Sequence, residues 1–319
     1  MQVTVDKNSG FCWGVVRAVN MAEAELSGQS ARKREQKLYV LGDIIHNPVE
    51  VERLRSEGLN TISHADFERI AIENNASGEP AKILIRAHGE PPSTYKKLSE
   101  LGIEVVDATC PVVSKVQERI RKFYDKGYQI AIFGKKEHAE VIGLRGVVND
   151  EAVVVKSVEE ALSKIKFDRP TVLFSQTTMD RPTFREIRDK LKERIADLVV
   201  DTMEETAVEF QAKDTICGQV SGRETKLVEL ARSQDVMIFV AGRNSSNAKV
   251  LYHISLDANP RTHFIEDERE IDLTWFQNAE TVAITGATST PQWLMQRVAD
   301  AIYKMCGEPE KAELLPIIA

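Results

Sequence analysis

The stretch that decides the fold is Asp107-Ala108-Thr109-Cys110-Pro111-Val112-Val113-Ser114-Lys115. A short apolar run over residues 103–106 leads into it and predicts a buried strand. Pro111 suits the first turn of a helix, and the apolar residues behind it recur at helical spacing. Cys110 therefore falls between a strand and a helix, where the positive end of the helix dipole favours the thiolate.

The same arrangement of a cysteine before a helical pattern occurs twice more. Cys12 lies in Ser9-Gly10-Phe11-Cys12-Trp13-Gly14-Val15, and Cys217 lies in Asp214-Thr215-Ile216-Cys217-Gly218. The three cysteines are about a hundred residues apart, which is close to one domain length. This repetition predicts one such cysteine in each of three domains.

The composition is that of an ordinary globular protein. The chain has 319 residues, of which 42% are hydrophobic and 29% charged, and its net charge of −7 argues against a nucleic-acid-binding surface. No apolar run reaches the roughly 18 residues of a membrane span, and the N-terminus lacks the apolar core of a signal peptide. We therefore expect a cytoplasmic protein without a membrane partner, whose four cysteines are thiols or metal ligands.

Strands and helices alternate along the whole chain, and the strands are written as continuous Val/Ile runs. This pattern predicts an α/β fold of three tandem domains with mostly parallel sheets. The expected domains are 1–108, 109–213 and 214–319, the last with a C-terminal tail. The expected strands are 37–41, 81–87, 103–106, 128–133, 152–155, 171–174, 198–201, 235–241, 263–266 and 281–285. The expected helices include 49–58, 184–196 and 292–305, and the charged residues 30–35 are expected to form a loop.

Ligands of parallel sheets collect outside the carboxyl ends of the strands, so three domains that turn these edges inward would bring the three cysteines together. Soft thiolates select zinc, copper(I) or iron–sulfur clusters, and the chain has none of the closely paired cysteines typical of zinc sites. Three cysteines on a cubane cluster would leave one iron open to substrate. Cys306, in a helical run near the C-terminus, is interpreted as a buried or incidental thiol.

Three histidines, His46, His88 and His138, each lie within a few residues of a predicted strand exit. Imidazole N–H groups, together with hydroxyls and loop N–H groups, suit the binding of phosphate oxygens. A purely structural role is the alternative for each. The other three histidines lack this placement and are interpreted as surface or packing residues; they are His64, His253 and His263.

Hydroxyl and amide side chains also follow predicted strands. The candidate phosphate donors are Ser245, Ser246, Asn247 and Ser289. The alternative is that Ser and Asn at these positions cap helices, and both roles are compatible. Glu140, two residues beyond His138, is the carboxyl group available for proton transfer. Thr177 and Thr178 are candidates to relay a proton or to position a substrate hydroxyl, and the alternative is a threonine-rich turn.

Taken together, these motifs resemble the 4-hydroxy-3-methylbut-2-enyl diphosphate reductase family. Nine segments match in order from residue 10 to residue 291. They are Gly10–Val15, Gly42–Asn47, Arg86–Gly89, Asp107–Pro111, His138–Glu140, Ser175–Thr178, Asp214–Cys217, Asn244–Asn247 and Ser289–Pro291. One such motif is a weak signal, whereas nine in register are a strong one.

The resemblance implies an oxidoreductase of isoprene biosynthesis that removes an allylic hydroxyl in the last step of the methylerythritol phosphate pathway, giving isopentenyl and dimethylallyl diphosphate. It implies a pseudo-threefold trefoil of three domains around one 4Fe–4S cluster, whose fourth iron takes the substrate oxygen. The cluster ligands would be Cys12, Cys110 and Cys217. The catalytic residues would be Glu140, Thr177 and His138. The diphosphate-binding residues would be His46, His88, His138, Ser245, Ser246, Asn247 and Ser289.

The sequence departs from the family pattern in three segments. Ala139 stands where the family often has proline, and Met179-Asp180 replaces the commoner Leu-Ser. After Cys217, Gly218-Gln219-Val220-Ser221-Gly222-Arg223 replaces the usual threonine- and asparagine-containing run. The first two changes leave the expected chemistry intact. The third puts the surroundings of the cluster in question, but not its ligation.

Two other functions fit the cysteine pattern. One is a different cluster enzyme with an open iron, such as a quinolinate synthase-like dehydratase, which needs no external electrons. The other is a non-catalytic iron–sulfur or zinc sensor, which needs no proton donor. The resemblance favours the reductase, and it implies an external electron donor such as flavodoxin or ferredoxin.

Overall fold

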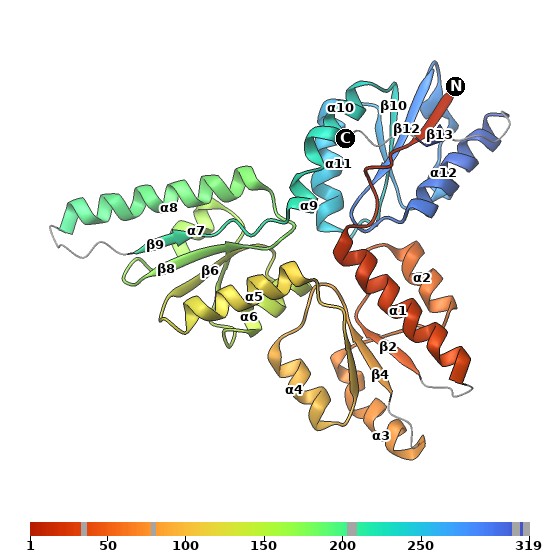
Figure 1. Cartoon of the computed structure of the whole chain (residues 1–319). Helices are drawn as coiled ribbons and strands as arrows, with labels where there is room; N and C mark the ends of the chain where they lie inside the picture. Colours follow the sequence, from red (N-terminus) through yellow and green to blue (C-terminus); the bar gives the residue numbers. More distant parts are fainter. Residues whose placement is uncertain (33–36, 78–80, 203–208, 308–312, 315–319) are drawn as a thin grey trace. The chain divides into compact units, whose positions relative to one another are not determined.

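Three parallel β-sheets with flanking helices make up the chain, so the predicted α/β class is confirmed (Figure 1). The computed structural model describes residues 1–32, 37–77, 81–202, 209–307 and 313–314. The chain divides into two units. The first comprises Met1–Ile62 and Gly218–Ala319, and the second comprises Ser63–Cys217.

The first sheet has five parallel strands in the order β11-β10-β12-β1-β13. Its strands are β1 (Gln2–Val5), β10 (Val236–Val240), β11 (Thr262–Ile265), β12 (Thr281–Gly286) and β13 (Glu313–Leu314). The unit also contains α9 (Gly218–Ser221), α10 (Glu224–Arg232), α11 (Ser246–Ala258) and α12 (Gln292–Met305). Both faces of this sheet are buried: Ile238 and Ile284 pack on the α12 side, and Phe239 packs on the other.

The second sheet has the order β3-β2-β4-β5. In the first unit β2 (Leu38–Leu41) pairs in parallel with β3 (Asn60–Ile62), and in the second unit β4 (Lys82–Ile85) pairs in parallel with β5 (Glu104–Asp107). The helices between these strands, with the long helix that precedes β2, are α1 (Trp13–Arg32), α2 (Pro48–Ser56), α3 (Phe67–Ser77) and α4 (Pro92–Glu100).

The third sheet has the order β7-β6-β8-β9, again all parallel. Its strands are β6 (Gln129–Phe133), β7 (Val153–Val155), β8 (Thr171–Ser175) and β9 (Phe210–Ala212). The helices of this part are α5 (Pro111–Tyr124), α6 (Ala139–Gly146), α7 (Val158–Lys164) and α8 (Arg181–Thr202). The helix predicted behind Cys110 is confirmed. Its residues Val113, Val116 and Ile120 are buried, whereas Val112, which was expected to share their spacing, is 38% exposed.

Two local predictions are wrong. Residues 198–201 were expected to be a strand, but they continue α8, because no glycine or proline interrupts the helical pattern there. The fourth strand of that sheet is instead β9, farther along the chain. Residues 30–32, expected in a loop, belong to the end of α1, and residues 33–36 lie outside the described part of the chain.

The short strand β1 is absent from the sequence prediction, yet it is an interior strand of the first sheet, between β12 and β13. The domain boundaries after residues 108 and 213 stay a prediction, as does the trefoil arrangement. Across the described ranges, we find no helix of the length and apolar character that crossing a membrane requires.

Helix α6, which carries Glu140, packs against a neighbouring loop through a glycine. A Cβ added to Gly146 would lie 2.4 Å from the Cβ of Pro91. We expect Gly146→Ala to destabilise the fold by about 1–3 kcal/mol, because the helix and the loop must separate. Gly28→Ala is the matched control: a Cβ there meets nothing within 4 Å, so the helix gains about 0.4–1 kcal/mol. Thermal unfolding of both variants measures the difference in stability. Equal midpoint temperatures of the two variants would contradict the close packing of Gly146 against Pro91.

Candidate functional site

The parallel register of the first sheet brings several loops to one edge. Val5 pairs with Ile284 and Val240 pairs with Gly286, so the loops after β1, β10 and β12 leave the sheet side by side. Such an edge is where parallel sheets bind ligands. The predicted site residues of the first unit follow the strands of this unit. Cys12 follows β1, His46 follows β2, and Ser289 follows β12. Ser245, Ser246 and Asn247 lie at the start of α11, after β10.

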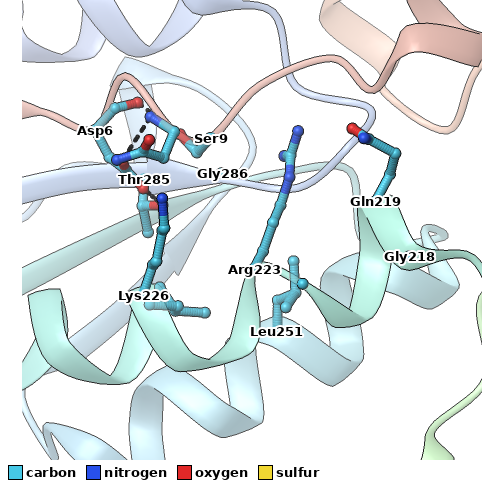
Figure 2. A pocket seen from close by; sticks show the side chains of 12 residues that line it. Asp6, Ser9, Gly218, Gln219, Arg223, Lys226, Leu251, Thr285 and Gly286 are labelled. Carbon is cyan, nitrogen blue, oxygen red and sulfur yellow. Dashed lines mark hydrogen bonds between the residues drawn. The ribbon is translucent and has the colours of Figure 1, made fainter. Parts of the chain in front are cut away.

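The loop that carries Cys12 is held by its backbone. The Cys12 N–H donates to the carbonyl of Thr288 at 3.1 Å, and Gln292 Nε2 donates to the carbonyl of Ser9 at 2.6 Å. Gly10 adopts a φ of 107°, which favours glycine, and its carbonyl accepts from Arg223 Nη1 at 2.7 Å. Figure 2 shows Arg223 rising toward this segment. The cysteine therefore has a fixed position just before α1.

Asn247, in the first turn of α11, has one side of its amide fixed. Its Oδ1 accepts from the Thr288 N–H at 3.0 Å and from the Thr288 hydroxyl at 2.8 Å. Because a backbone N–H can only donate, the amide orientation is determined, and Nδ2 must point the other way. Nδ2 is buried, and among the described residues it has no acceptor. Such a donor is suited to an anionic ligand.

The other candidate anion-binding residues of this unit are also adjacent. The Ser289 hydroxyl lies 3.4 Å from the Ser245 hydroxyl and 3.5 Å from the carbonyl of His46. The loop of His46 passes so close that a Cβ on Gly242 would lie 2.3 Å from the His46 carbonyl oxygen. Ser245 accepts from the Ala248 N–H at 3.2 Å, so its predicted capping role is confirmed. Ser246, also buried, follows at the first position of α11.

In the second unit, a tight turn after β4 carries His88. The Gly89 N–H donates to the carbonyl of Arg86 at 3.0 Å, and Gly89 has a φ of 71°. The Cys110 N–H donates to the carbonyl of Ala87 at 3.0 Å, so the cysteine and the histidine turn are joined. Cys110 is the N-cap residue of α5, as its place before Pro111 predicts.

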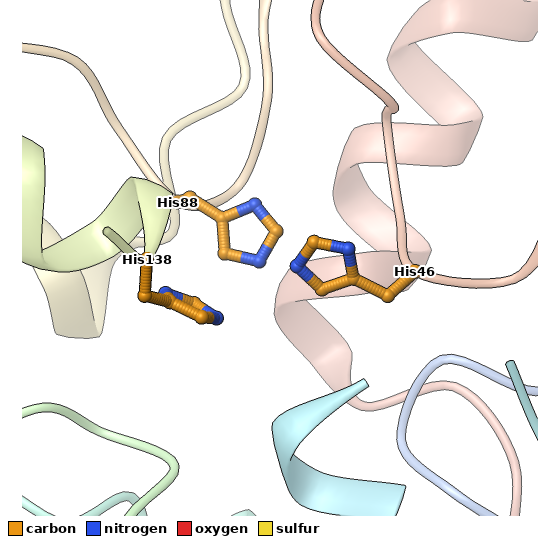
Figure 3. Close-up of side chains that lie close together, drawn as sticks. All are labelled: His46, His88 and His138. Atoms are coloured by element: carbon orange, nitrogen blue, oxygen red, sulfur yellow. The ribbon is translucent and has the colours of Figure 1, made fainter. Parts of the chain in front are cut away.

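His138 is the N-cap residue of α6, and its Nδ1 accepts from the Glu140 N–H at 3.2 Å. Since that N–H can only donate, a neutral His138 carries its proton on Nε2, which makes Nε2 a donor for a ligand. The rings of His88 and His138 lie edge to face with centroids 5.4 Å apart (Figure 3). The structure therefore brings together two of the three predicted histidines within this unit.

Glu140 is the most unusual group of the site because it is a buried carboxyl, 1% exposed. Its Oε1 accepts from the Thr177 N–H at 2.7 Å, and its Oε2 accepts from the Thr177 hydroxyl at 2.8 Å. Burial raises the pKa of Glu140 to about 7, although the two hydrogen bonds from Thr177 lower it. A carboxyl with this pKa holds or releases a proton near neutral pH, which is the requirement for a general acid.

The backbone of Cys217 contacts Thr177, the residue that holds Glu140. Its N–H donates to the carbonyl of Thr177 at 2.9 Å, and the preceding Thr215 hydroxyl bridges the backbone of Ser175. Because Phe133 pairs with Ser175, the loops after β6 and β8 leave the sheet together. One connected set of contacts thus runs from Cys217 through Thr177 and Glu140 to His138.

The cysteines fit a soft metal centre. Cys12, Cys110 and Cys217 are half-buried and lie at strand exits before helices, and within the described ranges no cysteine forms a disulfide. Partly accessible thiols in fixed loops are suitable donors for iron. Cys306 differs from these three cysteines because it is exposed at the end of α12 and lies in none of the site loops. The prediction offered a buried or an incidental thiol, and the buried alternative is wrong.

Sequence reasoning missed several residues that position the site. Thr288 orients both Cys12 and Asn247, and Gln176 holds the loop after β6 by accepting from the Lys135 N–H at 3.1 Å. Gly242 allows the close approach of the His46 loop. A glycine directly after a predicted strand is the one signal that could have identified Gly242.

Fold and site together define a parallel α/β protein with thiols, imidazoles and hydroxyls at the strand exits of each unit, and with a buried carboxyl in the second unit. The family model described as LytB protein matches residues 3–303. The chain belongs to the LytB protein family.

Several relatives bear the name 4-hydroxy-3-methylbut-2-enyl diphosphate reductase. The protein of Chloroherpeton thalassium is 48% identical, with 95% of this chain and 96% of that protein covered. The protein of Bacteroides thetaiotaomicron is 42% identical, with 95% and 98% covered. These identities extend over nearly the whole of each chain.

Two solved structures are similar. One, described as (E)-4-hydroxy-3-methyl-but-2-enyl diphosphate reductase, the terminal enzyme of the non-mevalonate pathway, has a TM-score of 0.67 at 32% identity, covering 95% of this chain and all of that chain. The other, the E-1-hydroxy-2-methyl-but-2-enyl-4-diphosphate reductase of Plasmodium falciparum, has a TM-score of 0.77 at 25% identity, covering 95% of this chain and 88% of that chain.

The orientation of Asn247 makes its charge-changing variant informative. Asn247→Asp keeps the acceptor for Thr288 but replaces the Nδ2 donor with a negative oxygen. We expect its affinity for inorganic pyrophosphate, measured by calorimetry, to fall at least about tenfold, since a hydrogen bond to a charged group contributes about 1.5–3 kcal/mol. Asn149→Asp, at an exposed turn, is the control. Equal affinities for the two variants would show that Asn247 does not face the anion.

Glu140 also predicts a pH dependence of stability. Between its ordinary pKa of 4.5 and the folded value of about 7, the folded chain holds a proton that the unfolded chain has released. The contribution of this group therefore falls as pH rises through that window, by about 2–3 kcal/mol. Denaturant unfolding of wild type and Glu140→Gln at pH 5 and pH 7 measures it, and the variant should lose less stability across the window. Parallel pH dependences would contradict the raised pKa.

Proposed function

We propose that this chain reduces 4-hydroxy-3-methylbut-2-enyl diphosphate, replacing its allylic hydroxyl with hydrogen. Two electrons and two protons convert the substrate into isopentenyl or dimethylallyl diphosphate and one water. The relatives at 42–48% identity are named for this reaction. The observation that carries the proposal is the buried Glu140, held by Thr177 and poised to donate a proton near neutral pH.

Glu140 protonates the leaving hydroxyl in this proposal. Loss of hydroxide from carbon is slow at neutral pH, and a positioned acid contributes about 10²–10⁴-fold. The Thr177 hydroxyl, 2.8 Å from Oε2, orients the carboxyl and positions the substrate oxygen. His138 Nδ1 accepts from the Glu140 N–H, which fixes the ring next to Glu140. In this proposal Nε2–H donates to the substrate.

Neutral donors suffice for much of the binding of the diphosphate in this proposal. Asn247 Nδ2 and the hydroxyls of Ser245 and Ser289 serve it in the first unit, together with Ser246 and His46. His88 and His138 contribute from the second unit. Because hydroxyl, amide and imidazole donors suffice, the site is compatible with a net charge of −7. An anchored diphosphate also fixes the reacting carbon in place.

Cys12, Cys110 and Cys217 would hold one 4Fe–4S cluster. When bound, the cluster delivers single electrons and offers an open iron as a Lewis acid. The chain positions the three thiols by backbone hydrogen bonds to Thr288, Ala87 and Thr177. Gly222 belongs to the altered segment after Cys217, and a Cβ there would lie 2.7 Å from the Gly218 carbonyl oxygen, so the local turn requires glycine.

The electrons come from a separate protein in this proposal, of the flavodoxin or ferredoxin type, and the chain works in the cytoplasm. A dehydratase would need no such donor. A sensor would need no buried acid, and Glu140 argues against that reading. The cysteine pattern fits both alternatives as well, but the relatives are named for the reductase.

Anaerobic reconstitution with iron and sulfide, followed by assay with the diphosphate substrate and dithionite, tests the function. We expect wild type to turn over and Glu140→Gln to keep its iron and sulfide content while losing about 10²–10⁴-fold in kcat. The control is Glu137→Gln, an exposed carboxyl in the loop just before α6.

Two results would contradict the proposal. One is a single zinc ion and no cluster in the reconstituted chain. The other is product formation without reductant, which would indicate the dehydratase.

A further inference from the structure

A large apolar side chain stands exposed beside one proposed cluster ligand. Trp13, the residue after Cys12, is 57% exposed, and Val16, one turn later on α1, is 38% exposed. Asn20 and Ala24 continue this exposed stripe without charge. An exposed tryptophan on a helix is a typical anchor of a protein interface.

The surroundings of this anchor are positive although the chain is acidic. Residues 7–22 contain no carboxylate and two cations, Lys7 and Arg17. A pocket of about 310 Å³ lies against the Cys12 loop, lined by Asn8 and Ser9 from that loop and by Arg223 and Lys226 from the start of α10. Figure 2 shows both cations projecting from that helix toward the Asp6–Ser9 segment.

The carboxylate of this pocket is largely withdrawn from solvent. Asp6 is 8% exposed, and it accepts from the Asn8 N–H at 2.8 Å and from the Thr285 hydroxyl at 2.9 Å. Glu224, the nearest acidic residue in α10, does not line the pocket. The accessible charges that line this pocket are therefore the cations Arg223 and Lys226, which favours an acidic partner.

We propose that Trp13 and Val16, with the cations around the Cys12 loop, form the docking surface for a small acidic protein that carries one electron. The inference rests on the proposed reductase function, which requires electrons from outside the chain. Each docked carrier is oxidised by one electron, so two encounters supply one turnover, in which R–OH, two electrons and two protons give R–H and water.

Geometry favours this face over other exposed apolar residues. Trp13 is bonded to Cys12, whose own N–H is fixed to Thr288, so a carrier seated here comes close to a proposed cluster ligand. Electron transfer slows steeply with distance. A small apolar anchor with a charged rim is also typical of transient redox encounters, which bury little area and associate quickly.

The test compares two electron sources in the reconstituted full-length chain. Photoreduced flavodoxin is the protein donor, and dithionite is the small-molecule donor that needs no docking surface. We expect Trp13→Ser to raise the KM for flavodoxin about tenfold, with the dithionite-driven rate unchanged. Val16→Ser should act in the same direction, and Lys226→Gln should raise this KM severalfold at low salt but not at high salt. Ile72→Ser, 70% exposed on α3, is the control.

The outcomes separate this proposal from the proposed function. If Trp13→Ser and Val16→Ser both leave the flavodoxin KM within twofold of wild type, the docking surface is wrong. If Trp13→Ser disturbs the cluster itself, the dithionite-driven rate falls too, and Val16→Ser then decides. If wild type reduces no substrate even with dithionite, the reductase function fails and not the surface alone.

Discussion

Parallel strand pairing is the constraint on which the site depends. When Val5 pairs with Ile284, and Phe133 with Ser175, neighbouring strands end at the same edge and their loops leave together. Residues far apart in sequence, such as Cys12 and Thr288 or Glu140 and Thr177, then come within hydrogen-bonding distance. Buried Val, Ile and Phe side chains on both faces of the strands fix these registers, so the hydrophobic core positions the chemistry.

The clearest consequence is the environment of Glu140. A buried carboxylate is unfavourable unless it is hydrogen-bonded, and here a single residue, Thr177, supplies both bonds. These bonds do not fully offset the loss of solvation, so the group keeps affinity for a proton near pH 7. The balance between burial and two hydrogen bonds therefore gives an ordinary side chain the properties of an acid catalyst. In the first unit, Thr288 likewise holds a side chain with two hydrogen bonds. Both bonds go to Asn247 Oδ1, so Asn247 Nδ2 is oriented as a donor.

Much of this arrangement is predictable from the sequence, for physical reasons. Continuous Val/Ile runs identify the strands, and the residues after them include Cys110, His138 and Glu140. The failures involve weak or nonlocal signals. Residues 198–201 look like a strand because they contain three consecutive apolar residues, but the helix continues through them. The strand β1 has only four residues, and its role depends on pairing with β12, nearly three hundred residues away in sequence. The orienting role of Thr288 cannot be predicted either, because its partners Cys12 and Asn247 are distant in sequence and a threonine in a turn has no distinguishing local pattern.

The central claim is that three distant cysteines hold a single cluster with one iron left for substrate. Mössbauer spectroscopy of the chain, reconstituted anaerobically with Mössbauer-active iron, tests this most directly. The account predicts a cubane spectrum in which one iron site differs from the other three and shifts when the diphosphate substrate is added. A spectrum without a cluster, or with four equivalent irons that substrate leaves unchanged, would contradict it.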